Sequence, residues 1–461
     1  MGLRHQALKG GFIMLIRQSL GILLSLVGMI FITRVIGPNE YGLFGASTGI
    51  IIFFYRLAPS GLDAYLLRKQ ANPEQQEYNQ AFTLLLCINI FCVVVLVLGR
   101  QMIAQLLRLP EVAPLIGILA LTIPLSTLNM PWVVKLERDL NYQRIAYIEV
   151  LSQITYYLVA IPLAVRGFGA WSPVFGLFTQ QASQLTLNYC SSNFRPRLCW
   201  NSSLIRTMLK YGLSYATSIW IWELRTLVNP VIVGRFAGAE AVAFVALCIR
   251  LVEMLSFAKA VTARLAVVAL AKLGDNKTRL RKSIQEGMRL QVLAVGLPMV
   301  SFALVAPVVI TLVFGKNWNP VLQIFPLIAV SYLTRTVFNL HSSVLYLKEK
   351  NLQVAWFNLV HVALFAGSAF LLMPHLGMIG YGWAEIFALA SCFILHLYTI
   401  REVGSLNYTE ALIWYTILVA VLILSAINNE ARYLSCLLLL VPLVSTKERN
   451  SLIGYFQIFK S

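Results

Sequence analysis

Charged residues are scarce in this sequence. They make up 12% of its 461 residues, and the mean hydropathy is +0.74, whereas soluble domains average about 25% charged residues. A chain this long with so little charge cannot cover a water-facing surface, which excludes a soluble fold, a disordered chain and a secreted disulfide scaffold. Many apolar segments near the ~20 residues that cross a bilayer as a helix predict an all-α polytopic membrane protein.

Cysteine and cleavage signals add little to that prediction. Five of the seven cysteines lie inside apolar runs, where cysteine behaves as a small hydrophobe. Cys190 and Cys199 flank one loop that has no metal-ligand spacing around them. The first apolar run starts near Gly10, holds Arg17 midway and lacks a small-residue cleavage pattern. We therefore expect no redox or metal role for cysteine and a first span that is retained.

Fourteen apolar runs dominate the chain, and no strand pattern stands out among them. The last two runs are short, so the expected count is fourteen spans, or twelve plus a re-entrant hairpin. The runs lie at 10–33, 41–65, 80–99, 112–134, 145–165, 169–190, 207–234, 238–263, 290–314, 318–346, 353–373, 377–400, 411–427 and 431–446.

Lysine and arginine are distributed unevenly between the loops. With the N-terminus inside, the inside segments carry 24 of these residues, the outside loops carry 7, and the remaining six lie within spans. Cytoplasmic loops are enriched in Lys and Arg, so we expect both termini in the cytoplasm. The same asymmetry accounts for most of the net charge of +18, which removes nucleic acid as a partner.

No loop is long enough to form a domain. The longest outer loop is about 100–111. The largest cytoplasmic loop, 264–289, is basic and is expected to lie along the anionic leaflet without a substrate role. Function must therefore be carried out by the membrane bundle itself. This argues against an enzyme such as a glycosyltransferase or polymerase, which generally needs a catalytic loop or domain outside the bilayer.

One short pattern occurs twice. It consists of an arginine, a glycine three residues on, and a glutamate followed four residues later by phenylalanine, and it spans Arg34–Phe44 and, with one residue dropped, Arg235–Phe244. Six spans separate the copies, which predicts parallel repeats, that is, two pseudo-symmetric six-helix lobes around a central cavity. The alternative to a repeat, that both copies are a common short helix–turn–helix sequence, stays open. The expected parts are an N-lobe at 1–190, a cytoplasmic linker at 191–206, a C-lobe at 207–400, and a C-terminal span pair with its tail at 401–461.

Charged side chains inside the spans are the candidate functional residues. A charge at mid-bilayer costs roughly 2.5–3.5 kcal/mol, so such side chains are expected to face a cavity. Arginines outnumber acids among them, which indicates an anionic substrate, since the guanidinium donates two parallel hydrogen bonds to phosphate. Local pairing, as of Arg250 with Glu253 or Arg225 with Glu223, is the alternative. The residues are Arg17, Arg56, Asp63, Glu223, Arg225, Arg250, Glu253, Arg335 and Glu385.

Two further polar features can be explained either by packing within the protein or by a role in transport. The sixth span carries a polar run around Gln184 that suits a sugar path and bonds to neighbouring helices equally well. The histidines of the late spans are expected to be packed and neutral rather than to form a proton relay. These are His341, His361 and His396.

The stretch Gly10–Arg17 and the following Thr33–Gly42 resemble the bacterial polysaccharide flippases of the multidrug/oligosaccharidyl-lipid/polysaccharide exporter superfamily. The likeness covers the whole chain in span layout and in the two-lobe repeat. It implies two six-helix lobes with an arginine-lined cavity that alternates its opening. It also implies translocation of undecaprenyl-diphosphate-linked oligosaccharide from the cytoplasmic to the outer leaflet, for O-antigen or exopolysaccharide export.

The resemblance also implies a set of substrate-binding residues. The related lipid II flippases line their cavity with arginines in spans 1, 2 and 8, where this chain has Arg17, Arg56 and Arg250. The segment Arg250–Glu253 resembles the Arg-Leu-x-Glu of the same span in those flippases. Glu253, Arg225 and Glu223 complete the expected site.

The same reading assigns partners and location. Expected partners are the lipid-linked glycan, membrane lipids and the polysaccharide assembly machinery, in the bacterial inner membrane. No cofactor is expected, and H⁺ and Na⁺ both stay open as the coupling ion. The competing function is a cation-coupled multidrug or metabolite antiporter, whose cavity should be acidic. A membrane O-antigen polymerase or ligase fits less well, because it should show a large outer loop.

Overall fold

The structure is a computed structural model that describes residues 3–69, 71–192, 194–257, 276–427 and 429–444, together with the isolated positions 259, 446, 448 and 449. Side chains of residues 3–20 fall outside the description, as do those of 22–23, 214–215, 218–219, 429 and 443. Every regular element in these ranges is helical, as the composition predicts. Two compact units, Met1–Ala243 and Phe244–Ser461, are treated separately below as the first and the second unit.

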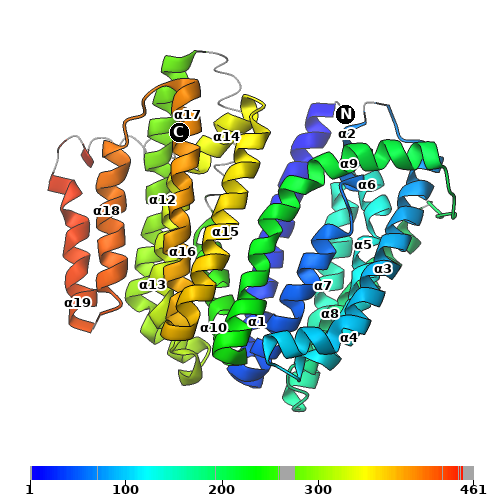
Figure 1. The fold of residues 1–461 in the computed structure, drawn as a ribbon, viewed down its shortest axis with the longest axis horizontal. Helices are drawn as coiled ribbons and strands as arrows, with labels where there is room; N and C mark the ends of the chain where they lie inside the picture. Colours follow the sequence, from blue (N-terminus) through cyan, green and yellow to red (C-terminus); the bar gives the residue numbers. More distant parts are fainter. Residues whose placement is uncertain are drawn as a thin grey trace. The chain divides into compact units, whose positions relative to one another are not determined.

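The first unit is built from helices that run alongside one another (Figure 1). Helix α7 packs on α1 and α8, α3 packs on α4, and α9 packs on α2. The elements are α1 (Leu3–Leu57), α2 (Leu62–Arg68), α3 (Gln75–Leu107), α4 (Val112–Ala120), α5 (Thr122–Thr127), α6 (Met130–Arg138), α7 (Tyr142–Val165), α8 (Trp171–Ser191), α9 (Ser202–Glu223), η1 (Leu224–Leu227), η2 (Val228–Val233) and the start of α10 (Gly234–Leu255).

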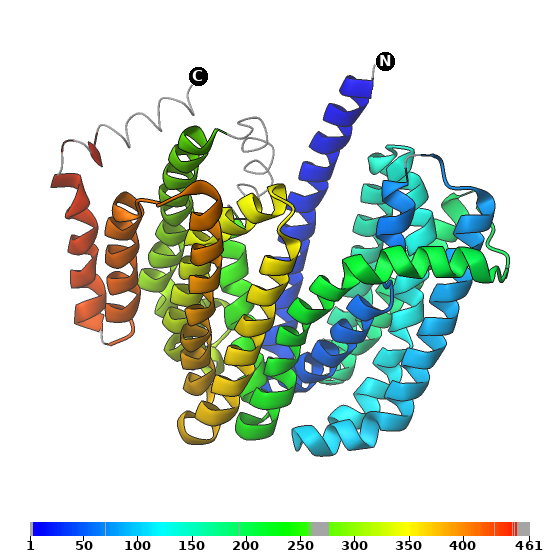
Figure 2. The ribbon, with the colours of Figure 1, turned by 45° about the horizontal axis from the view of Figure 1, so that its top comes forward.

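The second unit has the same helix-on-helix construction, seen from a second side in Figure 2. Helix α12 packs on α13 and α18, and α15 packs on α16. The elements after α10 are α12 (Lys277–Val313), η3 (Lys316–Trp318), α13 (Val321–Val337), α14 (Asn339–Leu347), α15 (Asn351–Leu376), α16 (Met378–Ala388), η4 (Leu389–Ser391), α17 (Cys392–Val403), α18 (Thr409–Leu424), α19 (Asn429–Leu434), η5 (Ser435–Leu440) and η6 (Pro442–Val444).

Fewer helices meet the length and composition expected of a membrane span than the apolar runs predict. Within the described residues, eight helices are long and apolar enough to cross a membrane, or nine if the bent pair of α1 and α2 counts as one span. Helix α8 is too polar for this criterion, and α18 and α19 are too short. Fourteen spans therefore stay a prediction, as do the boundaries of the two lobes. The C-terminal helix pair is present, with α18 beside α19 in both views (Figures 1 and 2).

The basic segment 264–289 is not a loop throughout, which corrects the sequence-based prediction. Residues 264–275 lie outside the described ranges, but α12 already begins at Lys277. The Asn276 side chain accepts the backbone N–H of Arg279 at 3.1 Å and caps the helix. Leu280 and Ile284 are buried on one face. The cap and this apolar stripe explain why the span helix starts earlier than its hydropathy indicates.

The predicted linker after α8 is held in place by the start of α3. Between Ser192 and Asn201 the chain is not helical. Side chains of Asn79 and Thr83 accept the backbone N–H groups of Arg197 and Cys199, each at 3.1 Å. Gln80 accepts the N–H of Asn201 at 2.8 Å. Polar side chains at the beginning of an otherwise apolar helix thus satisfy the backbone of the extended segment.

Candidate functional site

The candidate site is formed where α1 gives way to α2. The two helices are bent by 44° relative to each other. Pro59 in the break has no backbone N–H to donate, and Gly61 adopts φ 75°. A Cβ on Gly61 would lie 2.3 Å from the carbonyl oxygen of Gly212 on α9. Glycine is therefore required here twice, for its backbone conformation and for the close approach of α9.

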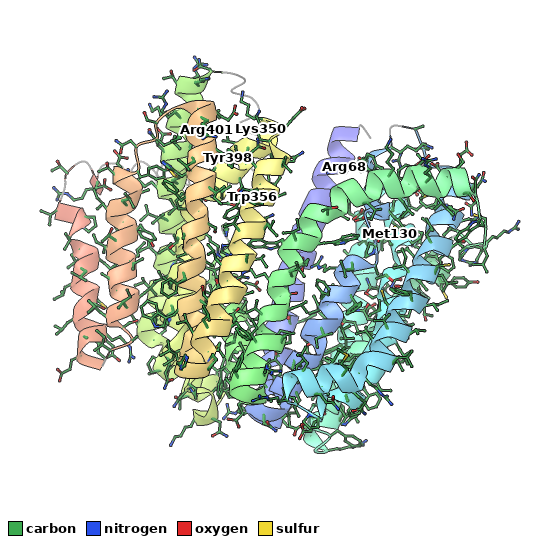
Figure 3. All side chains as sticks on the ribbon, in the orientation of Figure 1. Arg68, Met130, Lys350, Trp356, Tyr398 and Arg401 are labelled. Carbon is green, nitrogen blue, oxygen red and sulfur yellow. The ribbon has the colours of Figure 1, made fainter. Side chains whose placement is uncertain are left out.

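A cavity of about 530 Å³ lies beside this break, entirely within the first unit. Its volume is within the ~300–1,000 Å³ range of small-molecule sites. Helices α1, α2 and α5 to α9 all contribute to its wall, and one lining residue, Met130, is labelled among the helices of the first unit in Figure 3. The polar and aromatic lining residues are Tyr55, Arg56, Ser60, Asp63, Ser126, Thr127, Asn129, Glu137, Glu149, Gln184 and Trp220.

Acidic side chains outnumber basic ones in this wall. Asp63, Glu137 and Glu149 line the cavity, and Arg56 is the one cationic residue among its described lining residues. In the part of the chain that the structure describes, no group of three or more His, Cys, Asp or Glu residues could hold a metal ion. The acids are thus distributed along the wall, and the described lining residues do not show the arginine excess expected of the transport path.

Arg56 is paired but remains accessible. Its Nε lies 3.8 Å from Oε1 of Glu223, at the end of α9, and its Cζ lies 5.9 Å from the centre of the Tyr55 ring. The Arg56 side chain is 56% exposed and the Glu223 side chain 15% exposed. An ion pair with one such exposed member is worth about 0–1 kcal/mol. Glu223 therefore orients Arg56 without preventing its guanidinium from meeting another anion.

The other predicted residues lie elsewhere. Arg225 is on η1, with its Cζ 5.7 Å from the centre of the Trp222 ring. Arg250 and Glu253 are exposed on the part of α10 that belongs to the second unit. The Tyr332 hydroxyl donates to Oε1 of Glu253 at 3.3 Å. Arg17 is on α1, but its side chain lies outside the described residues.

Of the six predicted residues, the structure thus brings Arg56 and Glu223 together. It also supports both readings of the polar sixth span. Asn188 of α8 donates to Asn129 at 3.0 Å, and Ser183 lies 2.9 Å from the Thr155 hydroxyl, so this helix bonds to its neighbours. Gln184 of the same helix lines the cavity.

Two acids of the wall, Glu137 and Glu149, were not among the predicted residues. Glu149 lies within the apolar run 145–165, so the rule applied to the arginines also selects it. Glu137 follows the run 112–134 and has the position of an ordinary loop charge. Only the extension of α6 to Arg138 places it on a helix that borders the cavity.

Two bacterial proteins are similar to this chain in sequence. The chain is 24% identical over 366 residues to an uncharacterized membrane protein in the cps region of Klebsiella pneumoniae, covering 78% of this chain and 75% of that protein. It is 26% identical over 216 residues to the succinoglycan biosynthesis transport protein ExoT of Rhizobium meliloti, covering 47% of this chain and 43% of that protein.

The fold resembles that of a solved transporter. The lipid II flippase MurJ in an inward closed conformation superposes with a TM-score of 0.73 at 13% identity, over 98% of this chain and 100% of that one. This confirms the predicted all-α exporter fold. The sequence also matches the family described as polysaccharide biosynthesis protein over residues 31–323, more than half of its length. The chain is therefore a multi-pass membrane protein that belongs to the polysaccharide biosynthesis protein family.

Proposed function

We propose that this protein is a flippase that moves undecaprenyl-diphosphate-linked oligosaccharide from the cytoplasmic to the outer leaflet by alternating access. In this proposal it serves export of O-antigen or exopolysaccharide from the inner membrane of a bacterium, with both termini in the cytoplasm. The observation that carries the proposal is the polar cavity inside a unit made of membrane helices. Family membership, a relative described as a succinoglycan transport protein and the flippase-like fold support it.

The physical problem of such a reaction is the charge of the substrate. A diphosphate brings at least two negative charges toward the membrane interior, where lipid offers no hydrogen bonds. The protein must therefore supply cationic donors along the path. Arg56 meets this requirement, because its guanidinium lines the cavity and stays more than half exposed. Arg17 and Arg250 are its proposed partners in holding the diphosphate.

The test is complementation of a flippase-deficient strain, with surface glycan and membrane abundance measured together. Arg56→Ala should abolish glycan export at normal abundance. Arg56→Lys should restore part of it, since a point charge lacks the bidentate fork of arginine. Arg166→Ala, at an exposed position after α7, is the matched control and should export normally. Normal export by Arg17→Ala, Arg56→Ala and Arg250→Ala would refute the anionic-substrate mechanism.

One observation favours the competing antiporter function. The described lining residues of the cavity include three carboxylates and one arginine, and cation-binding transporters favour acidic cavities. Drug-susceptible cells that express the protein provide the test. Increased resistance to cationic drugs that is lost in Asp63→Asn, together with no effect on glycan export, would replace the flippase proposal with the antiporter function.

A further inference from the structure

We propose that the cavity of the first unit is the glycan subsite, and that its carboxylates select sugars that are neutral or carry amines and disfavour sugars that carry carboxylates. This inference rests on the proposed function and adds the charge class of the glycan to it. Its support is the chemistry of the cavity wall.

The wall offers the groups that bind a sugar ring. Sugar hydroxyls act as donors and acceptors, and the carboxyl groups of Asp63, Glu137 and Glu149 offer acceptor oxygens to them. A hydroxyl that donates to a carboxylate forms a charge-assisted bond, roughly twice as strong as a neutral one. Trp220 adds a flat apolar surface to the same wall, on which the C–H face of a sugar can pack.

Two neutral polar residues of the wall, Thr127 and Asn129, are committed to the protein itself. Thr127 donates to Oδ1 of Asn89 at 2.8 Å. The Asn129 amide donates to the Leu125 carbonyl oxygen at 2.8 Å, and its oxygen accepts from Asn188 at 3.0 Å. These bonds hold the wall of α5, α6 and α8 in place. The carboxylates of Asp63 and Glu137 are among the groups that a ligand can meet in this wall.

Two of these acids have no cation of their own. Among the residues that the structure describes, no Lys, Arg or His forms an ion pair with Asp63 or Glu137. Arg56, the one cation among the described residues of the wall, is shared with Glu223. The described part of the wall is thus net acidic, and an anionic sugar placed beside Asp63 and Glu137 would meet like charges, which is unfavourable at close range. An ammonium or a neutral hydroxyl would be accepted.

A metal ion does not satisfy these acids equally well. Hard cations need several oxygen ligands at about 2.0–2.6 Å, and the described residues hold no group of three or more acids that could ligate one ion. The separated acids and the volume of about 530 Å³ fit an extended organic ligand that several side chains contact at once.

Binding of three soluble trisaccharides to the purified full chain tests the selection. The probes are the trimers of glucosamine, N-acetylglucosamine and galacturonic acid, measured at pH 6 by calorimetry. We expect the glucosamine trimer to bind most tightly and the galacturonic acid trimer not to bind. Equal affinity for the amine-bearing and the acidic trimer would overturn the inference.

Two cavity variants locate the binding. Glu137→Gln and Asp63→Asn should each weaken the glucosamine trimer by about tenfold, the loss of one charge-assisted contact. Glu111→Gln removes an acid at an exposed position before α4 and should leave affinity unchanged. Thermal unfolding of each variant shows that it is folded. Wild-type affinity in both folded cavity variants would place the probe elsewhere and contradict the assignment.

Reconstituted flipping separates this inference from the function on which it rests. Proteoliposomes receive two undecaprenyl-diphosphate trisaccharides that differ only in N-acetylglucosamine or galacturonic acid. Faster flipping of the neutral substrate supports both proposals. Equal flipping of the two refutes the subsite and leaves the flippase function standing. Flipping of neither refutes the flippase function, and the glycan subsite with it.

Discussion

Gly37 and Gly238 adopt the same backbone conformation, with φ 78° and ψ 173° at the first and φ 81° and ψ −178° at the second. They are the glycines of the twice-occurring pattern. Each interrupts a helix at the turn between two expected spans. This region of φ/ψ space is essentially restricted to glycine, so the repeat found in the sequence is a repeat of backbone geometry as well.

The two copies also pack on each other within the first unit. A Cβ on Gly42 of the first copy would lie 1.8 Å from the carbonyl oxygen of Ala239 in the second. Charges of both copies contact the ends of other helices. Glu40 accepts the N–H of Ala170 at 2.8 Å, just before α8, and Arg235 donates to the Leu106 carbonyl oxygen at 3.0 Å, near the end of α3. The negative charge of Glu40 at the start of α8 and the positive charge of Arg235 at the end of α3 both interact favourably with the helix dipole.

Replacing either kink glycine should destabilise the protein through its backbone alone. No atom beyond the adjoining backbone lies within 4 Å of a Cβ built on Gly37 or Gly238, so Gly37→Ala and Gly238→Ala should each cost about 1–3 kcal/mol from strain. Gly367→Ala, in the middle of α15 and equally free of neighbours, should be neutral or stabilising by up to about 1 kcal/mol. Thermal unfolding in detergent measures all three, and equal melting temperatures would contradict the two kinks.

Arg335 has a structural role, because its charge is neutralised inside the second unit. Its Nη2 lies 3.7 Å from Oε2 of Glu385, which also accepts from the Ser331 hydroxyl at 2.8 Å, and both charged side chains are buried. Glu385→Ala should destabilise the unit by about 3–5 kcal/mol by leaving a buried cation. Combining Arg335→Met with Glu385→Leu should recover most of this loss. If the double variant is no more stable than Glu385→Ala, the pair is not the cause.

Replacing Arg138 with lysine should destabilise the protein. Its Nη1 donates to the carbonyl oxygens of Leu66 and Lys69, both at 2.9 Å, and its Nη2 donates to Ala71 and Asn72 at 3.1 Å. A lysine cannot reproduce this planar fork. We expect Arg138→Lys to cost about 1–2 kcal/mol and to make the segment after α2 more sensitive to trypsin. Arg144→Lys, exposed on α7, is the control, and identical digestion of both variants would refute the role.

Alkaline pH should weaken the second unit through Tyr408. The Tyr408 hydroxyl lies 2.6 Å from Nε2 of His341 and 2.8 Å from Nδ1 of His396. Burial raises the pKa of Tyr408 above its ordinary value of 10. The folded protein thus keeps the proton that the unfolded chain loses near pH 10, so this stabilisation is complete below pH 10 and decreases as the pH rises further.

Free energies of unfolding between pH 7 and 11 measure this effect. Tyr408→Phe should be less stable at pH 7, because it leaves two histidine nitrogens without the hydroxyl, and should lose less stability above pH 10. Tyr433→Phe, at an exposed position, should follow the wild type. A Tyr408→Phe curve parallel to the wild type would show that Tyr408 does not cause the alkaline loss.

The cytoplasmic assignment of the segment before α12 can be tested by labelling. The native cysteines are free among the described residues, so they are first replaced. Lys277→Cys should then react with an impermeant maleimide in inverted vesicles and not in whole cells. Leu109→Cys, in the longest outer loop, should show the opposite pattern. Labelling of position 277 in whole cells would reverse the predicted orientation.

Several features of the candidate site could not be predicted from the sequence, because they depend on contacts between distant segments. The pairing of Arg56 with Glu223 joins the ends of α1 and α9. Arg335 had equal grounds for facing a cavity or for pairing locally, and only the packing of α13 on α16 brings Glu385 to it. Glu137 is a loop charge by hydropathy and a cavity residue by position.

The sequence by itself determined that this protein lies in a membrane, that it is helical and which family it resembles. Apolar runs of bilayer length are expected to be helical, because a helix satisfies its own backbone hydrogen bonds where lipid offers none. The tertiary structure alone decided which charges neutralise each other, where α12 begins and which acids surround the cavity. Those outcomes depend on the distances between side chains of different helices, which no local pattern contains.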